Sequence, residues 1–156
     1  MKPLIHATAG TLAMLTIAIF WFSTLISEFF LDHAAVAEVK QDIVHALFLL
    51  VPVMALTGGS GFSLGKRRKG PLVERKKTRM AIVATNAFLV MIPAALFLNG
   101  KAASGEFDLK FYAVQVVEFV AGMVQFTLMG LNFRDGIKLS GRFDKGVPDR
   151  FPSDKP

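Results

Sequence analysis

The sequence predicts an all-α integral membrane protein, folded as a four-helix bundle of two antiparallel helical hairpins. Of its 156 residues, 53% are hydrophobic and the mean hydropathy is +0.47, which is too apolar for a soluble domain of this length. Long apolar segments account for the excess, and a spanning helix needs about 20 such residues. The two connections expected on the outer side are short and polar, so they force the spans they join to run antiparallel.

Residues 1–133 are expected to form a transmembrane domain of four spans. The first span is longer than the apolar core of a secretory signal, which is about 7–15 residues, so it should be retained. The second span contains Pro52, which should kink it, and a glycine cluster at residues 58–61 should end it. The connection 32–42 before it is polar but has a composition that suits helix. The spans cover about residues 4–31, 43–57, 80–98 and 111–133.

The residues after the fourth span, 134–156, are expected to form a cytoplasmic tail. They hold six basic and four acidic residues and several Gly and Pro near the end. The first part of the tail should lie as an amphipathic piece at the membrane interface, and the rest should be disordered.

The distribution of Lys and Arg orients the spans. One such residue precedes the first span, eight lie between Lys66 and Arg79, and six lie in the tail. The two other connections, 32–42 and 99–110, hold one and two. Because Lys and Arg are retained on the cytoplasmic side, both termini and the loop 58–79 should be cytoplasmic, in a bacterial-type inner membrane. The net charge of +6 is therefore a topology signal, and nucleic acid is not an expected partner.

The basic loop has a second interpretation beyond topology. Clustered Lys and Arg at a membrane surface attract anionic lipid head groups or an acidic partner. The residues that would make this contact are Lys66, Arg67, Arg68, Lys69, Arg75, Lys76, Lys77 and Arg79.

The fourth span carries polar residues at helical spacing. From Gln115 the intervals are three to Glu118, four to Gly122, three to Gln125 and seven to Asn132, so these residues share one face. Lipid should not contact a glutamate, so this face is expected to be buried against protein. Gln125 and an amide of the third span lie at matching depth and should pair. The predicted structural polar face consists of Gln115, Glu118, Gln125, Asn132 and Asn86.

The leading functional prediction is a small non-catalytic membrane subunit or accessory protein. The outer loops are short and no extramembrane domain is evident, which leaves little room for an independent enzyme. The polar face of the fourth span would either tie the four helices together or dock onto a larger membrane complex or a second copy.

A first alternative is a redox module that binds b-type haem or contacts quinone on the outer side. A bis-histidine haem needs two ligands at one depth that face each other. His33 and His45 meet this condition if the first helix continues past Asp32, and Glu118 lies in the same outer third. The chain resembles small four-helix membrane cytochromes in architecture only.

A second alternative is a protein that handles metal ions or protons. Asp42 and His45 have the i, i+3 spacing that places two ligands on one helical face, and Glu28 and Glu118 could add oxygen ligands. The carboxylate and amides of the fourth span could instead carry protons. The chain has no cysteine, which excludes a thiolate metal site, and it shows no nucleophile triad or phosphate-binding loop. The cofactor therefore stays open, with haem as one option.

Overall fold

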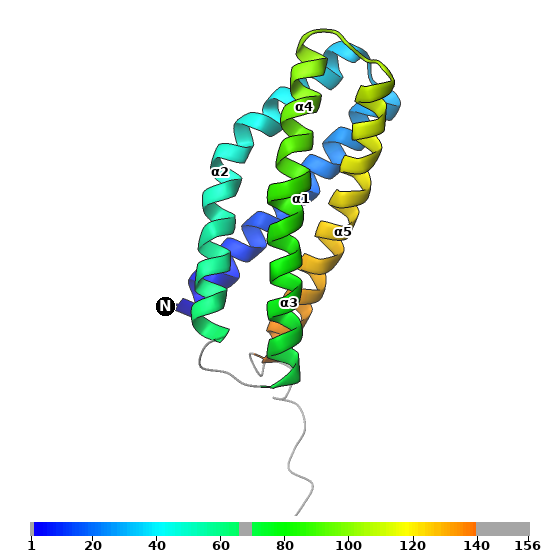
Figure 1. The fold of residues 1–156 in the computed structure, drawn as a ribbon. Coiled ribbons are helices and arrows are strands. Elements are labelled where there is room, and N and C mark those ends of the chain that lie inside the picture. Colours follow the sequence, from blue (N-terminus) through cyan, green and yellow to red (C-terminus); the bar gives the residue numbers. More distant parts are fainter. Residues whose placement is uncertain (1, 66–69, 140–156) are drawn as a thin grey trace, which may run out of the picture.

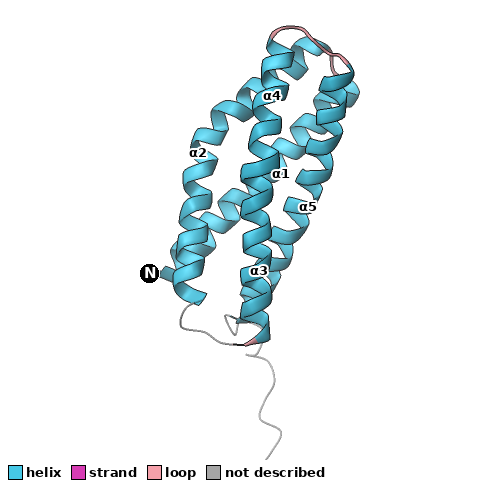
Figure 2. Ribbon diagram, viewed as in Figure 1, coloured by secondary structure: helices cyan, strands magenta, loops and turns pink. Residues whose placement is uncertain are grey.

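The computed structural model describes residues 2–65 and 70–139, and every element in these ranges is helical (Figure 2). The third helical stretch is continuous through three consecutive elements, the middle one a π-helix labelled η1. The elements are α1 (Lys2–Phe30), α2 (His33–Gly65), α3 (Pro71–Asn86), η1 (Ala87–Met91), α4 (Ile92–Ala103) and α5 (Leu109–Leu139).

Four of these helical stretches are long and apolar enough to cross a membrane, which indicates a multi-pass membrane protein. The side chains that face outward are mostly large and apolar, such as Leu4, Phe48 and Leu89. A surface of this kind would aggregate in water and suits a lipid environment. The four stretches are Leu4–Phe30, His33–Gly61, Pro71–Ala103 and Leu109–Lys138.

The helices lie side by side, with the two short turns at one end (Figure 1). α1 packs along α2, and the stretch from α3 to α4 packs along α5. The two pairs meet where α2 contacts α4 and α1 contacts α5. This arrangement is compatible with the predicted four-helix bundle of two hairpins.

The second helix begins ten residues earlier than the predicted span. The connection 32–42 is almost entirely helical, as its composition indicated, and only Leu31 and Asp32 separate α1 from α2. The Asp32 carboxylate accepts a hydrogen bond from the Ala35 N–H at 2.9 Å and caps the first turn of α2. The polar segment is therefore part of a helical face and not a separate loop.

The glycine cluster does not end the second helix, because α2 continues to Gly65, although the stretch long and apolar enough to cross a membrane ends at Gly61. Packing against α1 explains the continuation. His6 lies so close to Gly61 that a Cβ there would be 2.9 Å from its ring, and the ring nitrogen Nδ1 lies 3.1 Å from the Thr57 carbonyl oxygen. Tertiary contacts thus outweigh the low helix propensity of glycine, which costs about 1 kcal/mol per residue.

The third span contains a wide turn, η1, directly before Pro93. Proline has no N–H, and its ring clashes with the carbonyl one turn earlier. A π turn reroutes the hydrogen bonds of that turn and accommodates the ring without ending the helix. The span reaches from Pro71 to Ala103 and exceeds the predicted range 80–98 at both ends.

The last helix also extends beyond its predicted end, since α5 runs to Leu139. Arg134 to Leu139 continue the helix, so the first part of the tail is a direct extension of α5. Asp135 is buried against α3, where its Oδ2 accepts a hydrogen bond from Arg79 Nη1 at 2.6 Å. The expected disorder of the tail concerns residues 140–156, which lie outside the described residues.

Two apolar clusters form the core. One lies near the end with the short turns and joins Val36 of α2, Leu98 and Ala102 of α4, and Phe111 of α5. The other lies between α1 and α2 and centres on Ala13, Ile17 and Leu50. The polar residues described below lie between and beside these clusters.

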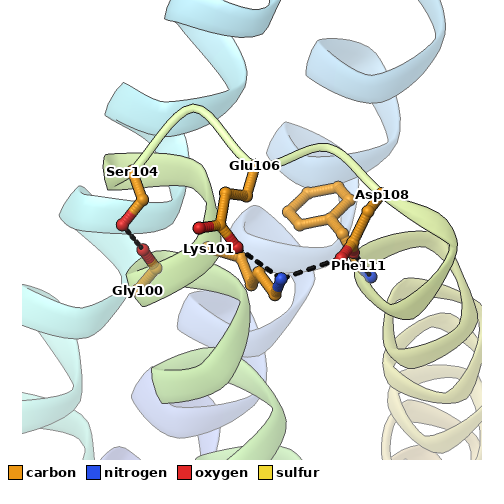
Figure 3. Close-up of polar contacts among 6 residues, drawn as sticks. All are labelled: Gly100, Lys101, Ser104, Glu106, Asp108 and Phe111. Carbon is orange, nitrogen blue, oxygen red and sulfur yellow. Dashed lines mark hydrogen bonds and ion pairs between the residues drawn. The ribbon is translucent and has the colours of Figure 1, made fainter.

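The turn from α4 to α5 is held by a small ionic network (Figure 3). Gly105 takes a φ of 69°, which favours glycine and ends α4. Lys101 Nζ donates to Glu106 and, at 2.8 Å, to Asp108 Oδ2. Asp108 Oδ1 accepts the Phe111 N–H at 2.9 Å, so Asp108 is the cap that starts α5.

We expect this turn to become less stable in acid. Two hydrogen bonds hold the pKa of Asp108 below its ordinary value of 3.8. The larger effect comes from the Lys101 ammonium and the smaller from the Phe111 N–H. A folded-state pKa below the unfolded one means that the contact stabilises the fold fully above the unfolded value and loses this effect as pH falls through the folded value. Thermal unfolding of Asp108→Asn should therefore differ most from wild type near neutral pH and converge with it in acid. An equal difference at every pH would contradict the charged contact.

Candidate functional site

The polar face of α5 is buried. Gln115, Glu118, Gln125 and Asn132 lie on one side of the helix and are 1% to 8% exposed. Asp135 extends the same face toward the end of the helix and is 2% exposed. The burial expected for this face is therefore confirmed, and such groups normally find partners inside the protein. Asn132 is the exception, since neither polar atom of its side chain has a hydrogen-bond partner among residues 2–65 and 70–139.

Glu118 forms a buried ion pair with Lys40 of α2. Lys40 Nζ lies 2.7 Å from Glu118 Oε2, and the two side chains are 1% and 10% exposed. Gln115 Nε2 donates a second hydrogen bond to the same oxygen at 3.0 Å. Charge-assisted bonds of this length are among the stronger ones in proteins. The pair fixes the depth of α2 relative to α5.

Lys40 is the residue that the sequence analysis missed. In the sequence it lies in a polar connection, yet it shares a helical face with Val36, Ile43 and Leu50, which are all buried. The spacing of four, three and seven along this face was the available signal. A lysine on an apolar stripe must be paired when it is fully buried.

Glu28 of α1 brings a second carboxylate to this region. It is partly buried and lies within electrostatic range of Lys40, Glu118 and His33. Its Oε1 is enclosed and has no hydrogen-bond partner among the described residues, and the same is true of Gln115 Oε1. The outer polar cluster, defined as Glu28, Lys40, Gln115 and Glu118, therefore has two acceptors that lack a donor.

The predicted pairing of Asn86 with Gln125 is present. Asn86 Nδ2 donates to Gln125 Oε1 at 2.9 Å and to the Ala121 carbonyl at 3.0 Å. The Ala121 contact identifies the Asn86 atom as the nitrogen, so the Gln125 atom facing it must be the oxygen. This bond joins α3 to α5 about two turns from Glu118.

Arg79, predicted as a lipid or partner contact, forms an ion pair with the buried Asp135. Lys77 pairs with Glu74 on the same helix at 2.8 Å, with both side chains well exposed. Arg75 and Lys76 lie on the same first turns of α3. The other four basic residues of the predicted contact, Lys66, Arg67, Arg68 and Lys69, lie outside the described residues.

The two histidines proposed for haem cannot serve one haem within this chain. The prediction required His33 to continue the first helix, but α1 ends at Phe30 and His33 is the first residue of α2. His33 and His45 therefore lie on one helix, and twelve residues separate them by roughly 18 Å. Both are exposed, and His33 stacks on Phe107 with ring centroids 4.0 Å apart.

The four predicted metal ligands are not brought together. Among the described residues no three His, Asp or Glu side chains are grouped so that they could hold a metal ion. Asp42 and His45 do share a face of α2, but that face is exposed, whereas Glu118 is buried and paired with Lys40. The geometry joins Glu28 and Glu118 and leaves Asp42 and His45 apart from them.

A cavity of about 60 Å³ lies beside the polar face. All four spans contribute to its wall, including Ala87 and Met91 at the two ends of the π turn. Most lining residues are apolar, and Glu118 and Gln125 are among the few polar ones. Trp21 also lines it and lies so close to Gly122 that a Cβ there would be 2.8 Å from the indole. The absence of a side chain at Gly122 thus leaves room for the Trp21 indole.

Comparison with known proteins assigns no family to the chain. No protein-family model, no curated protein and no solved structure matches it.

We expect Lys40→Met to destabilise the protein by about 3 kcal/mol, because it leaves the buried Glu118 carboxylate without its counter-ion. The double variant Lys40→Met with Glu118→Gln should recover most of this loss, since neither member of the ion pair is left charged without its partner and the new amide oxygen can still accept a hydrogen bond from Gln115. The free energy of unfolding can be measured by titrating sodium dodecyl sulfate into detergent-solubilised protein and following fluorescence.

The matched control is Lys77→Met, which removes a lysine from an exposed pair. Such a change should cost about 0–1 kcal/mol. If Lys40→Met costs no more than Lys77→Met, the buried pair does not hold α2 to α5.

Proposed function

We propose that the chain is a non-catalytic subunit or accessory protein of the inner membrane, with four spans and both termini in the cytoplasm. Its polar face serves to hold the four helices in register. A partner complex, or a second copy, would then contact the lipid-facing surface and not the polar face.

The observation that carries this proposal is that most polar groups of the α5 face are used within the chain. Glu118 is bonded to Lys40 of α2, Gln125 to Asn86 of α3, and Asp135 to Arg79 of α3. Interhelical polar bonds of this kind are common in membrane proteins, where each contributes about 1 kcal/mol. A face already occupied by its own helices has little capacity left for docking.

The charge distribution supports the proposed orientation. In the sequence, the basic segment that begins at Lys66 follows α2 and the basic tail follows α5, whereas the two short turns join α1 to α2 and α4 to α5. Retention of Lys and Arg in the cytoplasm places the basic segment and the tail inside. Arg75, Lys76 and Lys77 would then face the inner leaflet, where anionic lipid head groups are their proposed partners.

Purified protein tests this function directly. We expect its absorption spectrum in detergent to lack a Soret band, and we expect liposomes that contain it to show no proton flux beyond that of empty liposomes with a trapped pH-sensitive dye. Proton flux that disappears in the folded Lys40→Met, Glu118→Gln double variant would favour proton handling instead. A Soret band with sharp reduced peaks would favour a haem protein and overturn the accessory role.

The topology can be tested because the chain has no cysteine. We expect Ser104→Cys, in the turn between α4 and α5, to react in intact cells with a maleimide that cannot cross the inner membrane. Lys77→Cys should react only after the membrane is opened. The reverse pattern would contradict the proposed orientation and leave the helix packing unaffected.

A further inference from the structure

The cavity beside the polar face combines an apolar wall with two unpaired polar atoms. Lys40 and Gln115 both bond to Glu118 Oε2, and Glu118 Oε1 accepts no hydrogen bond among the described residues. Gln125 uses its Oε1 for Asn86, and its Nε2 donates no hydrogen bond there. Neither Glu118 Oε1 nor Gln125 Nε2 is among the fully enclosed unpaired atoms. Both residues line the cavity.

The two free atoms define the chemistry of an occupant. Glu118 Oε1 offers a charged acceptor, so it favours a group that donates a hydrogen bond. Gln125 Nε2 offers a donor about 10 Å farther along α5. Between them the wall consists of side chains such as Leu47, Met54 and Ile92. An ion would lose its hydration against such a wall, whereas a neutral molecule with an apolar body and a hydroxyl group would not.

The size of the cavity selects a slim molecule. Its volume of about 60 Å³ exceeds the roughly 10–15 Å³ that one water needs and falls short of the roughly 150 Å³ of an engineered cavity that holds benzene. A single aliphatic chain fits this range better than an aromatic ring. Water could meet the two polar ends, but it would find few partners along the apolar wall.

We propose that this cavity is a binding site for a single-chain aliphatic alcohol, whose hydroxyl donates to Glu118 Oε1 and whose chain lies along the wall between α1, α2, α4 and α5. The bonds from Lys40 and Gln115 hold the Glu118 carboxylate in place, so the acceptor is positioned before the alcohol arrives. Preorganisation of this kind favours binding because no side chain must be ordered.

The chain contains its own reporter for this site. Trp21 is the only tryptophan, and it lines the cavity with its indole N–H already bonded to the Phe119 carbonyl. A bromine atom that enters the cavity should quench its fluorescence. The probes are 3-bromo-1-propanol and 1-bromobutane, which have equal numbers of heavy atoms and differ in the hydroxyl.

We expect 3-bromo-1-propanol to quench Trp21 of the detergent-solubilised full chain in a saturable manner. In the Lys40→Met, Glu118→Gln double variant the charged acceptor is absent, so the affinity for the alcohol should fall roughly tenfold. The affinity for 1-bromobutane should stay unchanged. Ala95→Leu, which fills the cavity from α4 without touching the ion pair, should abolish saturable quenching by both probes.

Three results would overturn the proposal. Quenching that rises linearly with probe concentration would show that bromine reaches Trp21 only by collision from the detergent. Saturable quenching that survives Ala95→Leu in a variant with wild-type helicity would place the binding elsewhere. An alcohol affinity that the double variant leaves unchanged would show an apolar cavity without selectivity for the hydroxyl group. None of these results bears on the accessory role, which the flux and absorption measurements test separately.

Discussion

The ion pair between Lys40 and Glu118 is the constraint on which the rest of the structure depends. Neither charge can face hydrocarbon or an apolar core alone without a cost of several kcal/mol. α2 and α5 must therefore stay at one relative depth and one relative rotation. Once α5 is fixed in this way, helical periodicity turns Gln125, Asn132 and Asp135 toward the same interior. The contacts of α3 with this face then follow.

Much of this could be predicted from the sequence, because membrane spans leave strong signals. The length of the apolar segments predicted four helices, and the helical spacing of Gln115, Glu118, Gln125 and Asn132 predicted one buried face. Matching depth predicted the bond between Asn86 and Gln125. These predictions depend on the length of an apolar segment and on the helical spacing of its polar residues, and both can be recognised within a single helix.

The errors concern properties that depend on a neighbouring helix. Lys40 lies in a segment whose composition is polar, and only its ion pair with Glu118 of α5 shows that it faces inward. Where α2 ends depends on its contact with His6 of α1, which no pattern within α2 reveals. The expectation that His33 continues the first helix and faces His45 was wrong, because a two-residue turn assigns His33 to α2. In each case the chemical character of the residue was clear from the sequence, but the helix that it contacts was not.

The π turn in the third span changes which residues of that helix face inward. It accommodates one residue more than an α-helical turn, so each later position is rotated by about 100° from where an uninterrupted helix would place it. Asn86 before the turn and Ala94, Ala95 and Leu98 after it nevertheless all face inward. The two halves of the third span are thus rotated relative to each other about the helix axis. Deletion of one residue between Ala87 and Met91 would turn the π turn into an α-helical one and keep Asn86, Ala95 and Leu98 facing inward.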